Sequence, residues 1–128
     1  MTSDPPTAVV ADDSHELVRI LENVLSKRGF VVRSAHSGDE LIDVVRSAVD
    51  DGKPPDVVVS DVYMPGRSGL EAVATLRPTL PHTRFVLVSA YPGPVLESRV
   101  RAMDDVVLVP KPFDVVAFAE RIEKLVER

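Results

Sequence analysis

The chain has 128 residues, a mass of 14.0 kDa and a formal net charge of −5, which suits one globular domain with a sizeable core. Because it contains no cysteine, disulfide bonds and thiolate metal sites are excluded. The acidic balance argues against non-specific DNA binding, and the apolar runs are too short to span a membrane.

The first third of the chain predicts a strand, a helix and a second strand. Residues 1–6 carry two prolines and are expected to be a disordered lead-in, so that the domain covers residues 7–128. An apolar run at 8–11 predicts the first strand, and Ser14 is placed to cap a helix. Gly29 follows a basic turn, as is typical of a helix C-terminus. The second strand is expected to begin at Phe30, and its polar alternation afterwards indicates an edge position.

The middle of the chain predicts two helices around a buried strand. Ser37 and Glu40 have the spacing of a capping box at the start of the second helix. Residues 57–59 are three valines, which predict a central strand. Ser68 and Glu71 repeat the capping-box spacing, and prolines at 78 and 81 end the third helix that follows.

The last third of the chain continues the same alternation. Residues 85–88 predict a fourth strand, and a weaker helix is expected from about Val95 to Ala102. Pro92-Gly93-Pro94 lies before this helix and is expected to shorten or displace its start, because proline fixes φ and cannot donate a hydrogen bond. Residues 106–109 predict the fifth strand, and Asp114 is placed to cap a final helix.

Five strands that alternate with five helices predict an α/β fold with right-handed crossovers and helices on both faces of one sheet. The expected architecture is a doubly wound, five-stranded parallel sheet of the flavodoxin-like type, with strand order 2-1-3-4-5. In this order the first and third strands are neighbours. Their carboxyl ends meet at one edge of the sheet, where ligands bind in such folds.

Charged side chains follow three of the predicted strands at the point where each strand ends. Asp12 and Asp13 follow the first strand, Asp61 the third and Lys111 the fifth. Three carboxylates so close together repel one another unless one is protonated or a cation binds. A hard site made only of oxygen atoms, with room for water, is typical of Mg²⁺.

The remaining polar groups at this edge suggest a reaction. Lys111 supplies a positive charge opposite the acids, and Ser89 supplies a hydroxyl at the end of the fourth strand. A carboxylate, a divalent cation, an ammonium group and a hydroxyl together suit the in-line transfer of a phosphoryl group onto an aspartate.

Several motifs in order resemble the receiver domain of two-component response regulators, over about residues 7–127. They are Asp12-Asp13, the segment DVYMPG at 61–66 with Gly69, Ser89-Ala90 and Lys111-Pro112-Phe113. The resemblance implies that Asp61 accepts a phosphoryl group from a sensor histidine kinase or a histidine phosphotransfer protein. Such a domain promotes only its own phosphorylation and dephosphorylation and is not otherwise an enzyme.

The resemblance also implies roles for the other residues of the pocket. Asp13, Asp61 and the backbone carbonyl of Tyr63 would coordinate Mg²⁺, with Asp12 acting mainly through water. Ser89 would be the switch hydroxyl and Lys111 the counter-ion of the phosphoryl group, with a cis peptide bond before Pro112. Leu108 departs from the pattern, because the family usually has an aromatic residue three positions before the lysine.

Some alternatives stay open at this point. The chain is expected to be a cytoplasmic, single-domain regulator that signals by protein contact or in a phosphorelay, as a monomer or a weak phosphorylation-dependent dimer, with neither nucleic acid nor membrane as a direct partner. The alternative is a receiver excised from a longer regulator or hybrid kinase. Different readings are a flavin- or nucleotide-binding protein, an aspartyl phosphatase, or a receiver that binds partners without phosphorylation.

Overall fold

The computed structural model describes residues 4–127. Of the expected lead-in, residues 1–3 lie outside the described residues, and residues 4–6 have neither helix nor strand. The chain then alternates between strands and helices to its end. The strands are β1 (Thr7–Ala11), β2 (Val31–Ala35), β3 (Val57–Asp61), β4 (Arg84–Ser89) and β5 (Val106–Pro110). The helices are α1 (His15–Lys27), α2 (Gly38–Asp50), α3 (Gly69–Leu76), the short 3-10 turn η1 (Arg77–Thr79), α4 (Pro94–Arg101) and α5 (Val115–Val126).

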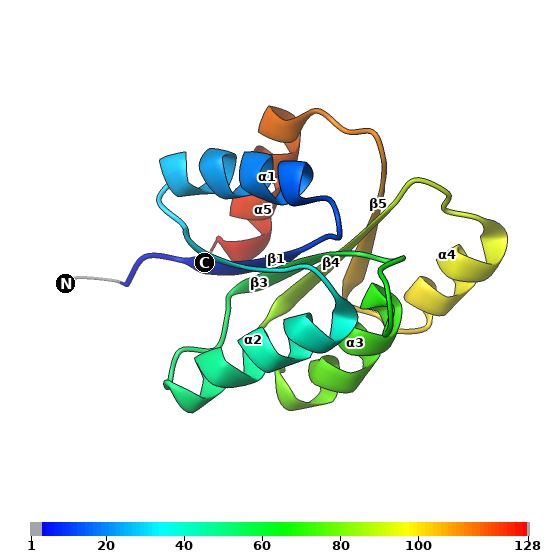
Figure 1. Ribbon diagram of the computed structural model, residues 1–128, viewed down its shortest axis with the longest axis horizontal. Helices are drawn as coiled ribbons and strands as arrows, with labels where there is room; N and C mark the ends of the chain where they lie inside the picture. The colour runs from blue at the N-terminus through cyan, green and yellow to red at the C-terminus, as the bar shows by residue number, and fades with distance from the viewer. Residues whose placement is uncertain (1–3, 128) are drawn as a thin grey trace.

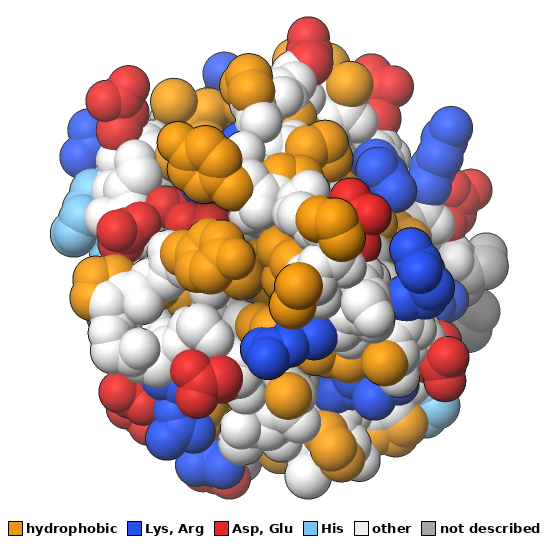
Figure 2. Space-filling view, turned by 90° about the vertical axis from the view of Figure 1, so that its right-hand side faces the viewer, with side chains coloured by type: hydrophobic (Ala, Val, Ile, Leu, Met, Phe, Trp, Pro, Cys, Tyr) orange, Lys and Arg blue, Asp and Glu red, His pale blue; other side chains and the backbone are white. Residues whose placement is uncertain are grey.

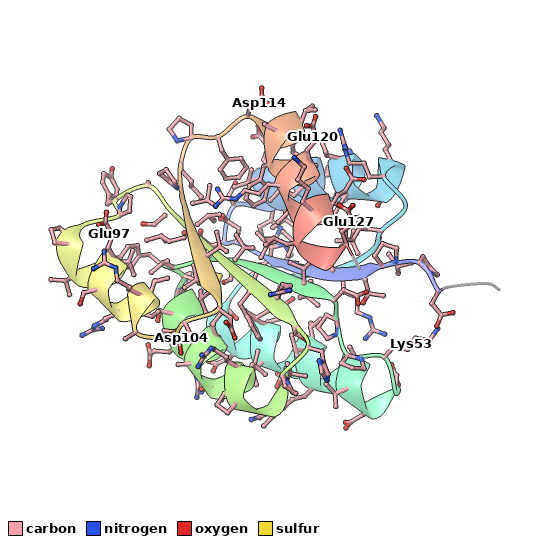
Figure 3. All side chains as sticks on the ribbon, turned by 180° about the vertical axis from the view of Figure 1, so that it is seen from behind. Lys53, Glu97, Asp104, Asp114, Glu120 and Glu127 are labelled. Carbon is pink, nitrogen blue, oxygen red and sulfur yellow. The ribbon has the colours of Figure 1, made fainter. Side chains whose placement is uncertain are left out.

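The five strands form one parallel sheet in the order β2-β1-β3-β4-β5, which confirms the predicted fold. Helices α1 and α5 cover one face, and α2, α3 and α4 cover the other (Figure 1). Glu97 on α4 and Asp114 before α5 lie on opposite sides of β5 in the view from behind (Figure 3). The sheet is therefore the middle of three layers.

The core explains why the central strands are so apolar. Neighbouring residues of a strand point to opposite faces, so Val58 packs in the cluster under α2, α3 and α4, and Val59 in the cluster under α1 and α5. All five residues of β3 are buried. Strand β2 is at the edge and is partly exposed along its length, as its polar alternation predicts.

Side-chain caps fix where most helices begin. The Ser14 hydroxyl accepts from the Leu17 amide at 3.2 Å, and the Asp114 carboxylate accepts from the Ala117 amide at 2.9 Å. At α3 both halves of the predicted capping box are formed, between Ser68 and Glu71. These caps satisfy amides of the first turn that lack partners within the helix.

The predicted capping box at α2 is only half correct. The Ser37 hydroxyl accepts from the Glu40 amide at 3.1 Å, but within the described residues no hydrogen bond returns from the Ser37 amide to the Glu40 side chain. A Glu40 carboxylate oxygen lies instead 3.8 Å from Nδ1 of His36.

Two predicted boundaries also shift by one residue. Strand β2 begins at Val31 and not at Phe30, because the Phe30 amide donates to the Leu25 carbonyl at 3.1 Å and so closes the end of α1. Helix α4 begins at Pro94, with Gly93 before it. Proline is tolerated in the first position of a helix, where its missing N–H has no partner to lose, so α4 starts directly at the second proline.

Candidate functional site

The register of the sheet brings the acidic residues together at its carboxyl edge. Ala11 of β1 pairs with Ser60 of β3, so the next residues, Asp12 and Asp61, are side by side. Carboxylate oxygens of Asp12, Asp13 and Asp61 lie within 4.8 Å of one another. Asp12 is only 2% exposed and Asp61 8%, whereas Asp13 faces solvent. The three carboxylates thus form one cluster with a buried floor and an open side.

Asp12 is held in place by backbone groups on either side of it. Its amide donates to the Ala35 carbonyl at the end of β2, at 3.1 Å. Its Oδ1 accepts from the Ser14 amide at 2.9 Å, so that the side chain also orders the turn into α1. Only its second oxygen, Oδ2, remains to face the cluster.

Lys111 enters the same cluster from the end of β5. Its Nζ donates to Oδ2 of Asp12 at 2.8 Å and lies 3.4 Å from Oδ2 of Asp61. The Lys111 amide donates to the Ser89 carbonyl at 2.8 Å, which ties this lysine to the end of β4. The peptide bond between Lys111 and Pro112 is cis, as the resemblance implies.

The electrostatic balance of the cluster disfavours a third negative charge. Burial, and then the neighbouring charge of Asp12, raise the pKa of Asp61, although Lys111 and the backbone N–H of Tyr63 oppose that rise. Burial also acts to lower the pKa of Lys111, but its hydrogen bond to Asp12 and the charges of Asp12 and Asp61 outweigh burial and raise this pKa. The lysine is therefore firmly charged, and it compensates the acids only in part.

Ser89 lies at the end of β4 and is completely buried. Its hydroxyl accepts from the Tyr91 amide at 3.1 Å. Tyr91 is 82% exposed and Tyr63 is 58% exposed. On the face shown in Figure 2, acidic side chains lie beside large hydrophobic ones.

The loop from Asp61 to α3 is closed by a glycine. The Gly69 amide donates to the Val62 carbonyl at 2.8 Å, and a Cβ built at Gly69 would lie 1.9 Å from the carbonyl oxygen of Asp61. Ser60, which sequence reasoning did not single out, donates its hydroxyl to the same carbonyl at 2.9 Å. The Ser60 hydroxyl thus holds the Asp61 carbonyl, and the packing there leaves no room for a side chain at position 69.

His15 is the first residue of α1. It is exposed, and its ring stacks on that of His36, with the ring centroids 3.9 Å apart. The sequence could not reveal this contact, because it joins the start of α1 to the end of β2.

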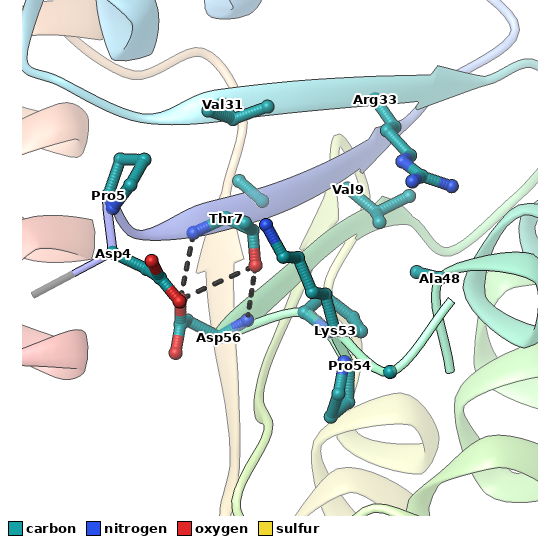
Figure 4. Close-up of a pocket in the computed structure, with 13 residues that line it drawn as sticks. Asp4, Pro5, Thr7, Val9, Val31, Arg33, Ala48, Lys53, Pro54 and Asp56 are labelled. Atoms are coloured by element: carbon teal, nitrogen blue, oxygen red, sulfur yellow. Dashed lines mark hydrogen bonds between the residues drawn. The ribbon is translucent and has the colours of Figure 1, made fainter. Parts of the chain in front are cut away.

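Two pockets lie away from the acidic cluster. One, of about 700 Å³, is at the opposite edge of the sheet, where Thr7 and Asp56 are joined by hydrogen bonds and Arg33 and Lys53 line the wall (Figure 4). Another, of about 360 Å³, lies between α4 and β5 and includes Leu108. None of the predicted catalytic or metal-binding residues lines either pocket. No helix among the described residues is both long and apolar enough to cross a bilayer.

Comparisons with known proteins agree with this geometry. The model of the response regulator receiver domain matches residues 8–123. The sensor kinase CckA of Brucella abortus is 29% identical over 98% of this chain and 13% of its own length. The transcriptional regulatory protein CpxR of Escherichia coli is 30% identical over 94% of this chain and 49% of its own length. The chain therefore spans half or less of these relatives.

Solved structures show the same fold. A chain in the CheX-CheY-BeF3-Mg complex from Borrelia burgdorferi has a TM-score of 0.83, with 20% sequence identity over 97% of this chain and 91% of that one. The family match covers nearly the whole domain and includes every strand end that carries a charged residue of the cluster. The chain belongs to the response regulator receiver domain family of two-component signalling systems.

Proposed function

We propose that this receiver accepts a phosphoryl group on Asp61 from a phosphohistidine of a sensor kinase or a histidine phosphotransfer protein. The observation that carries the proposal is the cluster itself, in which two carboxylates and one ammonium group surround the Asp61 side chain at the open edge of the sheet. An Asp61 oxygen attacks phosphorus, and the phosphorus–nitrogen bond of the donor breaks. The other ring nitrogen of the phosphohistidine carries a proton, so the departing imidazole keeps the electron pair of the broken bond and leaves as a neutral group.

The donor set fits Mg²⁺. Hard oxygen ligands and an open side for water are what this ion requires, and Asp61 and Asp12 are too buried for water alone to screen their repulsion. Asp13, Asp61 and the backbone carbonyl of Tyr63 would hold the ion, with Asp12 bound through water. When bound, the ion neutralises charge on the transferred oxygens.

Lys111 and Ser89 act on the phosphoryl group from the protein side. Lys111 already lies 3.4 Å from Asp61, so its ammonium group can follow the negative charge onto the phosphoryl oxygens. Ser89 accepts a hydrogen bond from the Tyr91 amide, which leaves its own hydroxyl proton free to be donated to a phosphoryl oxygen. Lys111 stands beside Asp61 before the reaction, so its contribution needs little reorganisation.

We propose that residues 7–128 act as one receiver unit. This unit passes on the signal by contact with another protein. Two settings fit the relatives, whose matched parts are segments of longer proteins. The receiver acts alone, in a phosphorelay or on a partner, or it works as one domain of a larger regulator. A flavin or nucleotide phosphate is disfavoured at this edge, because Asp12 and Asp13 stand where a phosphate-binding loop would be needed.

A small phosphodonor tests the proposal directly. Acetyl phosphate with Mg²⁺ is expected to add one phosphoryl group to the parent protein, measured by intact mass, and none to Asp61→Asn. Removal of Mg²⁺ by EDTA is expected to abolish the reaction. Incorporation into Asp61→Asn at the parent rate would show that another residue is the acceptor.

A further inference from the structure

Gly38 is the first residue of α2 and is buried against the loop that joins β3 to α3. A Cβ built on it would lie 2.0 Å from the carbonyl oxygen of Arg67 and 2.6 Å from its carbonyl carbon. Both are backbone atoms, so no change of rotamer relieves the overlap. The close approach of this loop to α2 therefore requires a residue without a side chain.

The loop concerned covers residues 62–68 and has little freedom to absorb a displacement. Its ends are joined by the hydrogen bond from the Gly69 amide to the Val62 carbonyl. Val62 and Met64 are buried in the core on the side of α2 and α3. At the surface, Nε of Arg67 lies 3.1 Å from a carboxylate oxygen of Asp39, the second residue of α2. A shift at Arg67 is consequently passed along a short, closed and partly buried segment.

Tyr63 connects this loop to the acidic cluster. Its backbone N–H favours the charged form of the Asp61 carboxylate and so acts to lower the pKa of that group, and its carbonyl is the Mg²⁺ ligand of the proposed function. We propose that Gly38 is a positioning residue for this site. Because Gly38 has no side chain, the Arg67 backbone can pack closely against the start of α2, and this packing sets where the Tyr63 carbonyl lies. The inference rests on the proposed function for the identity of the ion.

Helix propensity alone predicts the opposite effect of a substitution. Gly38 has the ordinary negative φ of a helical residue, since only Gly29, Gly52 and Gly66 have positive φ among the described glycines. Alanine is the better helix former at such a position. A loss of function in Gly38→Ala would thus report the collision with Arg67 and not a weakened helix.

The test compares Gly38→Ala with Gly93→Ala. Gly93 is the N-cap residue of α4 and has φ of −96°. A Cβ built on it would meet no atom within 4 Å. Mg²⁺ affinity is measured by calorimetry, and the rate of phosphorylation by acetyl phosphate is measured over a range of Mg²⁺ concentrations. We expect Gly38→Ala to weaken Mg²⁺ binding by at least tenfold and Gly93→Ala to change it by less than twofold. A phosphorylation rate that recovers at saturating Mg²⁺ is expected for Gly38→Ala.

A purely structural role for Gly38 would lower thermal stability and leave the Mg²⁺ dissociation constant of the folded variant within twofold of the parent. That result would overturn the inference. If Gly38→Ala does not fold, an NMR titration of the parent with Mg²⁺ decides. We expect the amides of Gly38 and Arg67 to shift in step with that of Tyr63.

The titration also separates the two proposals. Shifts at Asp61 and Tyr63 without any at Gly38 or Arg67 would overturn the positioning role and leave the magnesium site standing. No shift at Asp61 and Tyr63 would overturn the magnesium site itself, and with it the role of Gly38.

Discussion

Asp61 combines two demands that conflict at the scale of a single residue. The proposed reaction requires Asp61 to be buried away from bulk water, yet its charge is then close to that of Asp12. In the unfolded chain the carboxyl has its ordinary pKa, and burial raises that pKa in the folded chain. The stability of the protein therefore falls as pH rises through the interval between the two pKa values, and it stays lower above that interval.

Asp61→Asn is expected to stabilise the metal-free protein at neutral pH, because it removes the ionised group. The melting temperature should rise by roughly 5 °C. The gain should shrink as the pH falls through the interval between the raised pKa and the ordinary aspartate pKa, and it should vanish below that interval, where the Asp61 carboxyl of the parent is protonated in both states. Thermal denaturation in EDTA at several pH values measures this. A variant that is less stable than the parent at neutral pH would contradict the expectation that the ionised Asp61 carboxylate destabilises the metal-free protein.

Removal of the Lys111 ammonium group is expected to have the opposite effect on stability, because Asp12 would then be buried without its cation. Lys111→Met keeps most of the apolar stem and is expected to destabilise the metal-free protein by roughly 1–3 kcal/mol, the cost of a buried acceptor left unpaired. Added Mg²⁺ should restore more stability to this variant than to the parent. Urea denaturation with and without Mg²⁺ checks the prediction, and equal gains in both proteins would argue against it.

At the scale of elements, the start of α3 holds the loop that follows Asp61 in place. Gly69→Ala would put a Cβ 1.9 Å from the Asp61 carbonyl oxygen. Overpacking of this kind costs about 1–3 kcal/mol or more. We expect a corresponding loss of stability and slower phosphorylation by acetyl phosphate. Gly93→Ala is the control, because a Cβ built at position 93 would meet no atom within 4 Å. Equal stability of the two variants would contradict the steric overlap between residue 69 and the Asp61 carbonyl.

The two capping motifs give a second comparison between elements. Glu71 completes the capping box of α3, whereas Glu40 at α2 does not return a hydrogen bond to Ser37. Glu71→Ala is therefore expected to cost about 0.5–1 kcal/mol, and Glu40→Ala close to nothing. Chemical denaturation of both variants measures the difference. A larger loss for Glu40→Ala would mean that the α2 box forms in solution.

At the scale of the whole molecule, the sequence predicts the fold well because local and global signals agree. The apolar runs, such as residues 57–59, mark buried parallel strands, and the capping residues mark the helices between them. The acidic cluster was predictable for the same reason: Asp12 and Asp61 end neighbouring strands, and register then places them side by side. The alternation of strands with helices and the order of the strands therefore predict both the fold and the acidic cluster.

Contacts between elements that are distant in sequence could not be predicted in this way. The stacking of His36 on His15 and the close packing of Arg67 on Gly38 both depend on tertiary packing. A glycine at the start of a helix gives no signal of its own in the sequence, because its role depends on which atom of another segment packs against it. The missed residue is therefore one that acts by having no side chain.

A crystal structure of the protein with Mg²⁺ and beryllium fluoride, a phosphoryl mimic, tests the central claim most directly. We expect one Mg²⁺ bound by Asp13, Asp61 and the Tyr63 carbonyl, with the fluoride group on Asp61 and within reach of Lys111 and Ser89. An ion bound elsewhere, or a fluoride group absent from Asp61 at saturating concentration, would contradict the account.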